Sequence, residues 1–105
     1  MKDYFVYILK CSDDSYYTGV TNNLEKRINE HQSGIIKGYT SKKLPVKLVF
    51  SERFNDITQA IKFEKQIKGW SRKKKEALIN GNFDELKRLS NLKRNNVILS
   101  LSKDE

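Results

Sequence analysis

Two strand-like runs near the start of the chain, joined by a short polar link, constrain the fold more than any other feature. Residues 4–11 are β-branched and aromatic without clean alternation, as in a strand that is covered on both faces. Residues 12–15 have turn composition, and residues 16–20 are strand-like again. We therefore predict a β-hairpin, with Cys11 buried or half-buried at the end of its first strand rather than catalytic.

Helical patterns follow this hairpin. Asn22 and Glu25 have the spacing of a capping box, and Gly34 is placed to end the helix in a left-handed conformation. A basic loop then leads to Pro45, and a third strand begins at Val46. The expected helices are 23–33, one capped by Asp56 or Thr58 and ended by Gly69, 72–80 capped by Ser71, and a shorter one from Asn82 or Asp84 to about Leu89.

Length and charge limit what the chain can do. Its 105 residues suffice for one core, so we expect a domain over 1–80, a helical extension over 81–90 and a mobile or loosely docked tail over 91–105. A net charge of +8 favours a polyanionic partner, nucleic acid before an anionic membrane surface. The sequence has no membrane-spanning run and no signal-peptide pattern, which predicts a cytoplasmic location. One Cys and one His cannot form a zinc ligand set.

A carboxylate lies on the apolar face of the helix that begins near residue 57. At 100° per residue, Glu64 falls within about 50° of the centre of that face. Burying an ionised carboxylate is costly, so Glu64 needs a cation, a metal ion or a wet cleft. An ordinary salt bridge to a nearby Arg or Lys explains this position equally well.

Other polar residues border the same core. Arg27 and His31 are four residues apart on the inner face of the first helix. Tyr7 and Tyr17 share a face of the hairpin if its connecting loop holds an odd number of residues. With Glu64 these side chains predict a polar pocket. Taken singly, Arg27 can extend to solvent, His31 can be a satisfied interior histidine, and the tyrosines can simply build a core.

Positive charge is concentrated beside Glu64. Residues 62–76 hold seven basic and two acidic residues, which carry +5 of the net charge. We predict that this segment binds phosphates and that Trp70 stacks on a base or sugar. The alternative is that these charged residues simply form a solvated helix face. The predicted nucleic-acid contacts are Lys68, Trp70, Arg72, Lys73 and Lys74.

The ordered set of these residues resembles the GIY-YIG nuclease superfamily over about residues 3–80. The resemblance is to its short stand-alone members, which are related to the nuclease domains of excinucleases and of structure-specific endonucleases. The first namesake triplet keeps only its tyrosine, and the second keeps Tyr and Gly. The matching motifs are Phe5-Val6-Tyr7, Tyr17-Thr18-Gly19, Arg27 with His31, and Glu64 in Phe63-Glu64-Lys65.

The resemblance implies an α/β (α+β) fold, in which a central three-stranded antiparallel sheet, formed by the hairpin and a strand over 46–54, is flanked by helices. It also implies cleavage of DNA phosphodiester bonds with one divalent cation, Mg²⁺ or Mn²⁺, held by Glu64. Tyr7 would act as general base and Arg27 would bind the phosphate. Tyr17 and His31 would position water or phosphate. Gly19 is a structural motif residue, and the loop residues Tyr39, Thr40, Lys42 and Lys43 would touch the DNA backbone.

Three hypotheses follow from the sequence. The first is a DNA endonuclease that acts in DNA repair or that processes branched or single-strand-containing DNA. The second is a non-catalytic module that binds DNA or RNA. The third is an adaptor that is active only when it is docked on a larger repair or recombination protein. A monomer is the default oligomeric state for each of them.

Overall fold

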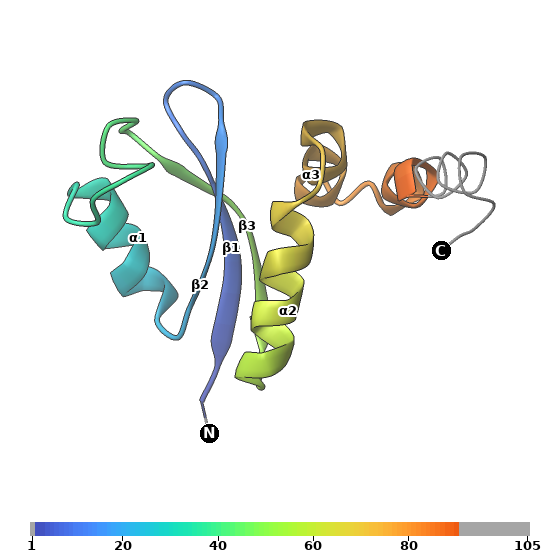
Figure 1. Ribbon diagram of the computed structural model, residues 1–105, viewed down its shortest axis with the longest axis horizontal. Coiled ribbons are helices and arrows are strands. Elements are labelled where there is room, and N and C mark those ends of the chain that lie inside the picture. Colours follow the sequence, from blue (N-terminus) through green and yellow to red (C-terminus); the bar gives the residue numbers. More distant parts are fainter. Residues whose placement is uncertain (1, 91–105) are drawn as a thin grey trace. The chain divides into compact units, whose positions relative to one another are not determined.

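A computed structural model describes residues 2–90 of the chain (Figure 1). The predicted tail over 91–105 lies outside the described residues. The described residues form two compact units, one over residues 2–69 and the other over residues 70–90. The predicted domain limits stay predictions. The elements are β1 (Tyr4–Lys10), β2 (Tyr16–Thr21), α1 (Leu24–Gln32), β3 (Lys47–Phe54), α2 (Ile57–Lys68) and α3 (Arg72–Ile79), followed by helical residues 83–90.

The first unit is an antiparallel sheet with strand order β2-β1-β3. The helices α1 and α2 cover opposite faces of this sheet (Figure 1). Because β1 is the central strand and is covered twice, its Val6, Ile8 and Leu9 are completely buried. The predicted α+β class, with a three-stranded antiparallel sheet flanked by helices, is confirmed.

The register of the hairpin decides which residues share a face. Residues 11–15, an odd number, connect β1 to β2 and place Tyr7 opposite Gly19 and Leu9 opposite Tyr17. Directly opposed residues lie on the same face, so Tyr7 and Tyr17 are diagonal neighbours there. The condition set by the sequence is therefore met.

Each face of the sheet has its own packing. On the α1 side, Tyr7 and Leu9 pack with Cys11 and Val46, and Leu24 and Ile28 of α1 cover them. Cys11 is buried directly after β1, as predicted. On the other side α2 buries Ala60 and Ile67 and contacts all three strands. Aromatic rings add to this second layer, because Phe63 packs against Phe50 and Phe54.

The helix ends confirm most of the local predictions and correct one. Asn23 caps α1, because its backbone is extended and its side-chain oxygen accepts the N–H of Lys26. The predicted capping box of Asn22 and Glu25 is therefore wrong by one residue. Gly34 has φ +78°, the left-handed conformation that was predicted for it.

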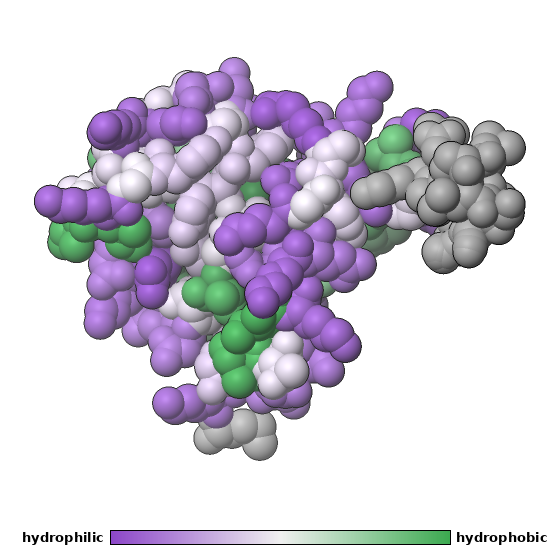
Figure 2. Space-filling model, in the orientation of Figure 1, coloured by the Kyte–Doolittle hydropathy of each residue, from purple (hydrophilic) through white to green (hydrophobic). Residues whose placement is uncertain are grey.

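The later caps follow the sequence closely. Asp56 caps α2 and Gly69 ends it, while Ser71 caps α3. The side chain of Asn82 accepts the N–H of Glu85 at the start of the helical residues 83–90. Within residues 2–90, no helix is both long enough and apolar enough to cross a membrane. Hydrophilic side chains cover much of the face shown in Figure 2.

Candidate active site

The centre of the candidate site is a buried chain of three hydrogen-bonded side chains. Tyr7 Oη lies 2.9 Å from His31 Nε2, and His31 Nδ1 lies 2.8 Å from Thr40 Oγ1. The exposed fractions of the three residues are 1%, 0% and 1%. Strand β1, helix α1 and the loop that follows α1 each contribute one member. Both ring nitrogens of His31 are therefore satisfied away from solvent.

Thr40 is placed differently from the sequence prediction, which put it on the nucleic-acid-binding surface. Its side chain is buried against His31, so it does not lie at the surface of this structure. The preceding residue, Tyr39, is 45% exposed. Composition marked the loop as basic and polar, but it carried no signal for which of two adjacent residues turns inward.

Aromatic rings lead from this buried chain toward solvent. The Tyr17 ring centre lies 6.3 Å from that of Tyr7, 5.1 Å from that of His31 and 6.1 Å from that of Tyr39. Lys43 Nζ lies 3.7 Å from the centre of the Tyr39 ring and 3.1 Å from an Asp13 carboxylate oxygen. The exposed Tyr39 thus stands at the outer end of a row that begins at Tyr7.

Gly19 leaves room for the Tyr7 hydroxyl. A Cβ at this position would lie 2.5 Å from Tyr7 Oη and 2.6 Å from Tyr7 Cζ, closer than such atoms pack in proteins. The Tyr-x-Gly motif therefore has a steric basis here. Thr18, which opposes Ile8 and so faces the other side of the sheet, is buried, and its Oγ1 has no hydrogen-bond partner among the described residues.

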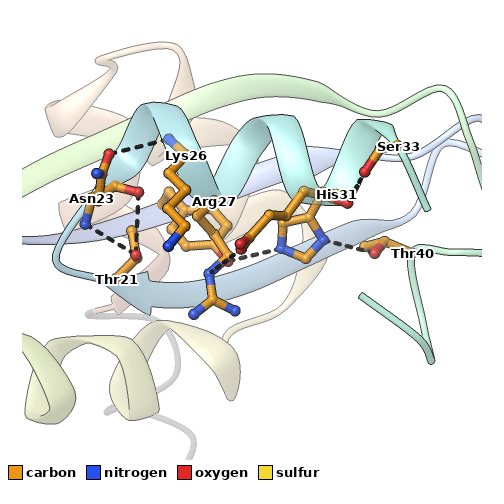
Figure 3. Close-up of polar contacts among 9 residues, drawn as sticks. Thr21, Asn23, Lys26, Arg27, His31, Ser33 and Thr40 are labelled. Carbon is orange, nitrogen blue, oxygen red and sulfur yellow. Dashed lines mark hydrogen bonds and ion pairs between the residues drawn. The ribbon is translucent and has the colours of Figure 1, made fainter. Parts of the chain in front are cut away.

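Arg27 projects from the same side of α1 as His31 (Figure 3). Its side chain is 40% exposed, and its Nε lies 3.7 Å from a Glu30 oxygen. It also lines a small cavity of about 280 Å³ that Thr21 and Asn22 border. A half-exposed guanidinium at this position is available to an anion, whereas the adjacent imidazole is not.

The electrostatics keep the buried pair neutral at rest. Burial raises the pKa of Tyr7 far above its usual value, and Tyr17 raises it further. The Arg27 charge lowers this pKa by less than either, and Glu64 and Glu30 raise it by smaller amounts. Burial, followed by the Arg27 charge, lowers the pKa of His31. Arg27 therefore favours the Tyr7 phenolate, but burial outweighs its effect.

Glu64 is buried on α2, with 7% of its surface exposed. Its Oε2 lies 2.7 Å from Nζ of Lys68, one helical turn later. The sequence allows a salt bridge as the alternative explanation for Glu64, and this salt bridge is present. Its cation is Lys68, which the sequence predicts to contact nucleic acid. Glu64 raises the pKa of Tyr7, and Tyr17 raises the pKa of Lys68, so the Glu64–Lys68 pair of α2 is within electrostatic reach of both tyrosines.

The predicted basic contacts divide between the two compact units. Lys42 is exposed and Lys43 half-buried in the first unit. In the second unit, Lys74 Nζ lies 4.4 Å from the centre of a Trp70 ring and Arg72 forms an ion pair of 3.1 Å with Glu76. The remaining member, Lys73, is exposed.

Taken together, the fold and site define an α+β domain with Tyr, Arg and His on one face of a three-stranded sheet and a glutamate on the helix of the opposite face. A family model described as the GIY-YIG catalytic domain matches residues 3–77. The chain therefore belongs to the GIY-YIG catalytic domain family.

Single-domain relatives and solved structures agree with this membership. A UPF0213 protein of Natronomonas pharaonis is 46% identical over 77 residues, which cover 73% of this chain and 91% of the relative. The UPF0213 protein YazA of Bacillus subtilis is 42% identical, over 73% of this chain and 78% of its own. The solution NMR structure of a UPF0213 protein from Bacillus halodurans is 37% identical, with TM-score 0.51, and covers 84% of this chain and 97% of that one.

Proposed function

We propose that this chain is a divalent-metal-dependent DNA endonuclease that hydrolyses phosphodiester bonds, with branched or single-strand-containing DNA as substrate in repair or DNA processing. The observation that carries the proposal is the buried hydrogen bond between Tyr7 and His31, with the half-exposed Arg27 beside it. This arrangement places a proton acceptor and an anion-binding group on the same side of helix α1. Membership of the GIY-YIG family supports the same activity.

Tyr7 and His31 can remove the proton of an attacking water in two linked transfers. The water proton passes to Tyr7 Oη while the proton of Tyr7 passes to His31 Nε2, 2.9 Å away. The oxygen of the water forms the new bond to phosphorus, and the leaving oxygen departs with the electron pair of the broken bond. Arg27 stabilises the negative charge on the phosphate as this happens. Tyr17, whose ring centre lies 5.1 Å from that of His31, would position the water.

Glu64 is suited to hold one Mg²⁺ or Mn²⁺. Residues 2–90 contain no cluster of three or more His, Cys, Asp or Glu side chains that could enclose an ion. A single buried carboxylate fits a cation that retains several waters and takes substrate phosphate oxygens as its other ligands. When bound, the cation would supply charge neutralisation at the scissile phosphate. Lys68 must then release the Glu64 carboxylate or share it.

Contacts to DNA are expected to be largely electrostatic. The net charge of +8 favours binding to the phosphate backbone. In the first unit, Tyr39, Lys42 and Lys43 are the candidate contacts, all on the loop that follows α1. The candidates in the second unit are Trp70, Arg72, Lys73 and Lys74. A single active site in a monomer cuts one strand, so nicked product is expected.

Cleavage assays test this proposal directly. Branched, single-strand-containing and duplex DNA are incubated with the full chain and Mg²⁺ or Mn²⁺, and Glu64→Gln is compared with Glu52→Gln, a change of the same charge at an exposed residue of β3. We expect Glu64→Gln to lower the cleavage rate about 10³-fold, because the cation provides several kcal/mol of transition-state stabilisation. Cleavage that is equal in both variants would contradict the proposal.

The ion pair between Glu64 and Lys68 favours a second function, a non-catalytic module that binds nucleic acid. In that protein the carboxylate would be permanently occupied by lysine. Salt-sensitive DNA or RNA binding without cleavage under any divalent metal would support this module over the nuclease. Cleavage that appears only after a larger repair protein is added would identify the adaptor instead.

A further inference from the structure

We propose that Thr40 is a positioning residue that fixes the tautomer of His31. The Thr40 hydroxyl oxygen accepts a hydrogen bond from Nδ1–H, which leaves Nε2 without a hydrogen and ready to accept the proton of Tyr7. The inference rests on the proposed nuclease function, because it assigns Thr40 a role in the same site. It does not require Thr40 to touch the substrate, and its 1% exposure is consistent with that.

The geometry limits a neutral His31 to two arrangements. Each ring nitrogen faces one hydroxyl, at 2.9 Å for Tyr7 and 2.8 Å for Thr40, and a hydroxyl can donate or accept. Either Tyr7 donates to Nε2 and Nδ1–H donates to Thr40, or both bonds run in the opposite direction. Only the first arrangement gives the phenolic proton a base to move to.

Chemistry favours the first arrangement. A phenol is a much stronger acid than an aliphatic alcohol, so Tyr7 is the better donor to the free nitrogen of the ring. Thr40 is then left with the role of acceptor, which its hydroxyl oxygen fills without any rearrangement.

The loop that carries Thr40 is held by bonds of its own. The backbone carbonyl of Thr40 accepts the N–H of Lys43, and Lys43 is bound in turn to the hairpin connection through its carbonyl, which accepts the N–H of Ser12, and through its ion pair with Asp13. Gly38 and Ser41 exchange two further bonds across the loop. These bonds hold the loop in place and so fix the position of the Thr40 hydroxyl beside His31.

The composition of the chain makes the test direct, because His31 is the only histidine. In tag-free full-length protein labelled with ¹⁵N-histidine, NMR shifts of the two ring nitrogens report the tautomer without any assignment problem. We expect the wild type to carry its hydrogen on Nδ1. Thr40→Val keeps the shape but removes the acceptor, so the hydrogen should move to Nε2, whereas Thr40→Ser should keep it on Nδ1.

Thr18→Val is the matched control. It removes another buried threonine hydroxyl, one that has no described partner and faces the opposite side of the sheet. It should change neither the tautomer nor the cleavage rate. In DNA cleavage with Mg²⁺, we expect Thr40→Val to lower kcat about 10- to 100-fold with KM little changed, as for other residues that orient a catalytic group, and Thr40→Ser to retain most of the wild-type kcat.

The outcomes separate this inference from the proposed function. A wild-type histidine with its hydrogen on Nε2 would overturn the inference whatever the variants do, including the case in which Thr40→Val fails to fold. If the wild type cuts DNA, equal kcat in Thr40→Val and Thr18→Val would also overturn it. If the tautomer changes as expected but the wild type cuts no DNA with any divalent metal, the proposed function fails while the role of Thr40 in holding His31 stands.

Discussion

The two halves of the candidate site are built differently. On the α1 face of the sheet, Tyr7, His31 and Thr40 form a buried and uncharged chain of hydrogen bonds. On α2, Glu64 is charged and held by Lys68, whose side chain is 58% exposed. The side chains of the first half are already hydrogen-bonded to one another without a ligand. In the second half, the flexible side chain of Lys68 occupies the Glu64 carboxylate, and a ligand can displace it. Substitutions in the first half should therefore alter chemistry, and substitutions in the second should alter metal binding.

Tyr7→Phe should produce the largest change. It removes the proton acceptor, so we expect the cleavage rate to fall about 10²- to 10⁴-fold. It also leaves Nε2 of His31 buried without its hydroxyl partner, which should lower the free energy of unfolding by about 1–3 kcal/mol. Single-turnover cleavage and urea unfolding measure the two effects. Tyr4→Phe, on the same strand, is the control. An equal loss of cleavage rate in both variants would contradict the role of Tyr7 as proton acceptor.

Gly19→Ala tests how tightly the first half of the site is packed. Its Cβ would lie 2.5 Å from Tyr7 Oη, so the tyrosine must move and its bond to His31 should lengthen or break. We expect a loss of about 1–3 kcal/mol in the free energy of unfolding, with a large loss of cleavage. Gly69→Ala is the control, because its nearest contact would be an ordinary 3.7 Å. Full activity in Gly19→Ala would show that the Tyr7 side chain is not rigidly packed against Gly19.

Lys68→Met should act mainly on the other half of the site. It frees the Glu64 carboxylate, so we expect Mn²⁺ to bind more tightly. The measurement is a Mn²⁺ titration monitored by magnetic resonance of the ion, in which half-saturation should occur at a lower Mn²⁺ concentration than in the wild type. Lys65→Met removes the same charge from an exposed position of α2 and should leave metal binding close to wild type. A weaker affinity in Lys68→Met than in Lys65→Met would mean that Lys68 assists the cation rather than competing with it.

The smallest effect concerns the pH dependence of stability. Burial lowers the pKa of His31 below its usual 6.5, so the unfolded chain binds a proton more readily than the folded one. The contribution of His31 to stability is complete above pH 6.5 and is lost as the pH falls from there through the folded-state pKa. Titration of the His31 ring shifts by NMR should give a midpoint below 6.5. A midpoint above 6.5 would contradict the neutral state assigned to the ring.

Much of the fold could be predicted from the sequence, because caps, turns and periodicity are local. Asp56, Ser71 and Gly34 take the roles that their residue types favour, and the odd length of the hairpin connection is enough to put Tyr7 and Tyr17 on one face. The error at Asn22 arose because two adjacent asparagines can both cap, and only the backbone geometry distinguishes them.

The sequence by itself predicted most residues of the candidate site, including the carboxylate of Glu64 on an apolar helix face and the pair of Arg27 and His31 on one face of the first helix. The tertiary structure alone decided their partners. Thr40 turns inward because loop closure brings it against His31, nine residues earlier, and no local periodicity encodes that approach. Likewise the neutral state of Tyr7 follows from burial by several elements at once, a property that belongs to the folded chain rather than to any segment of it.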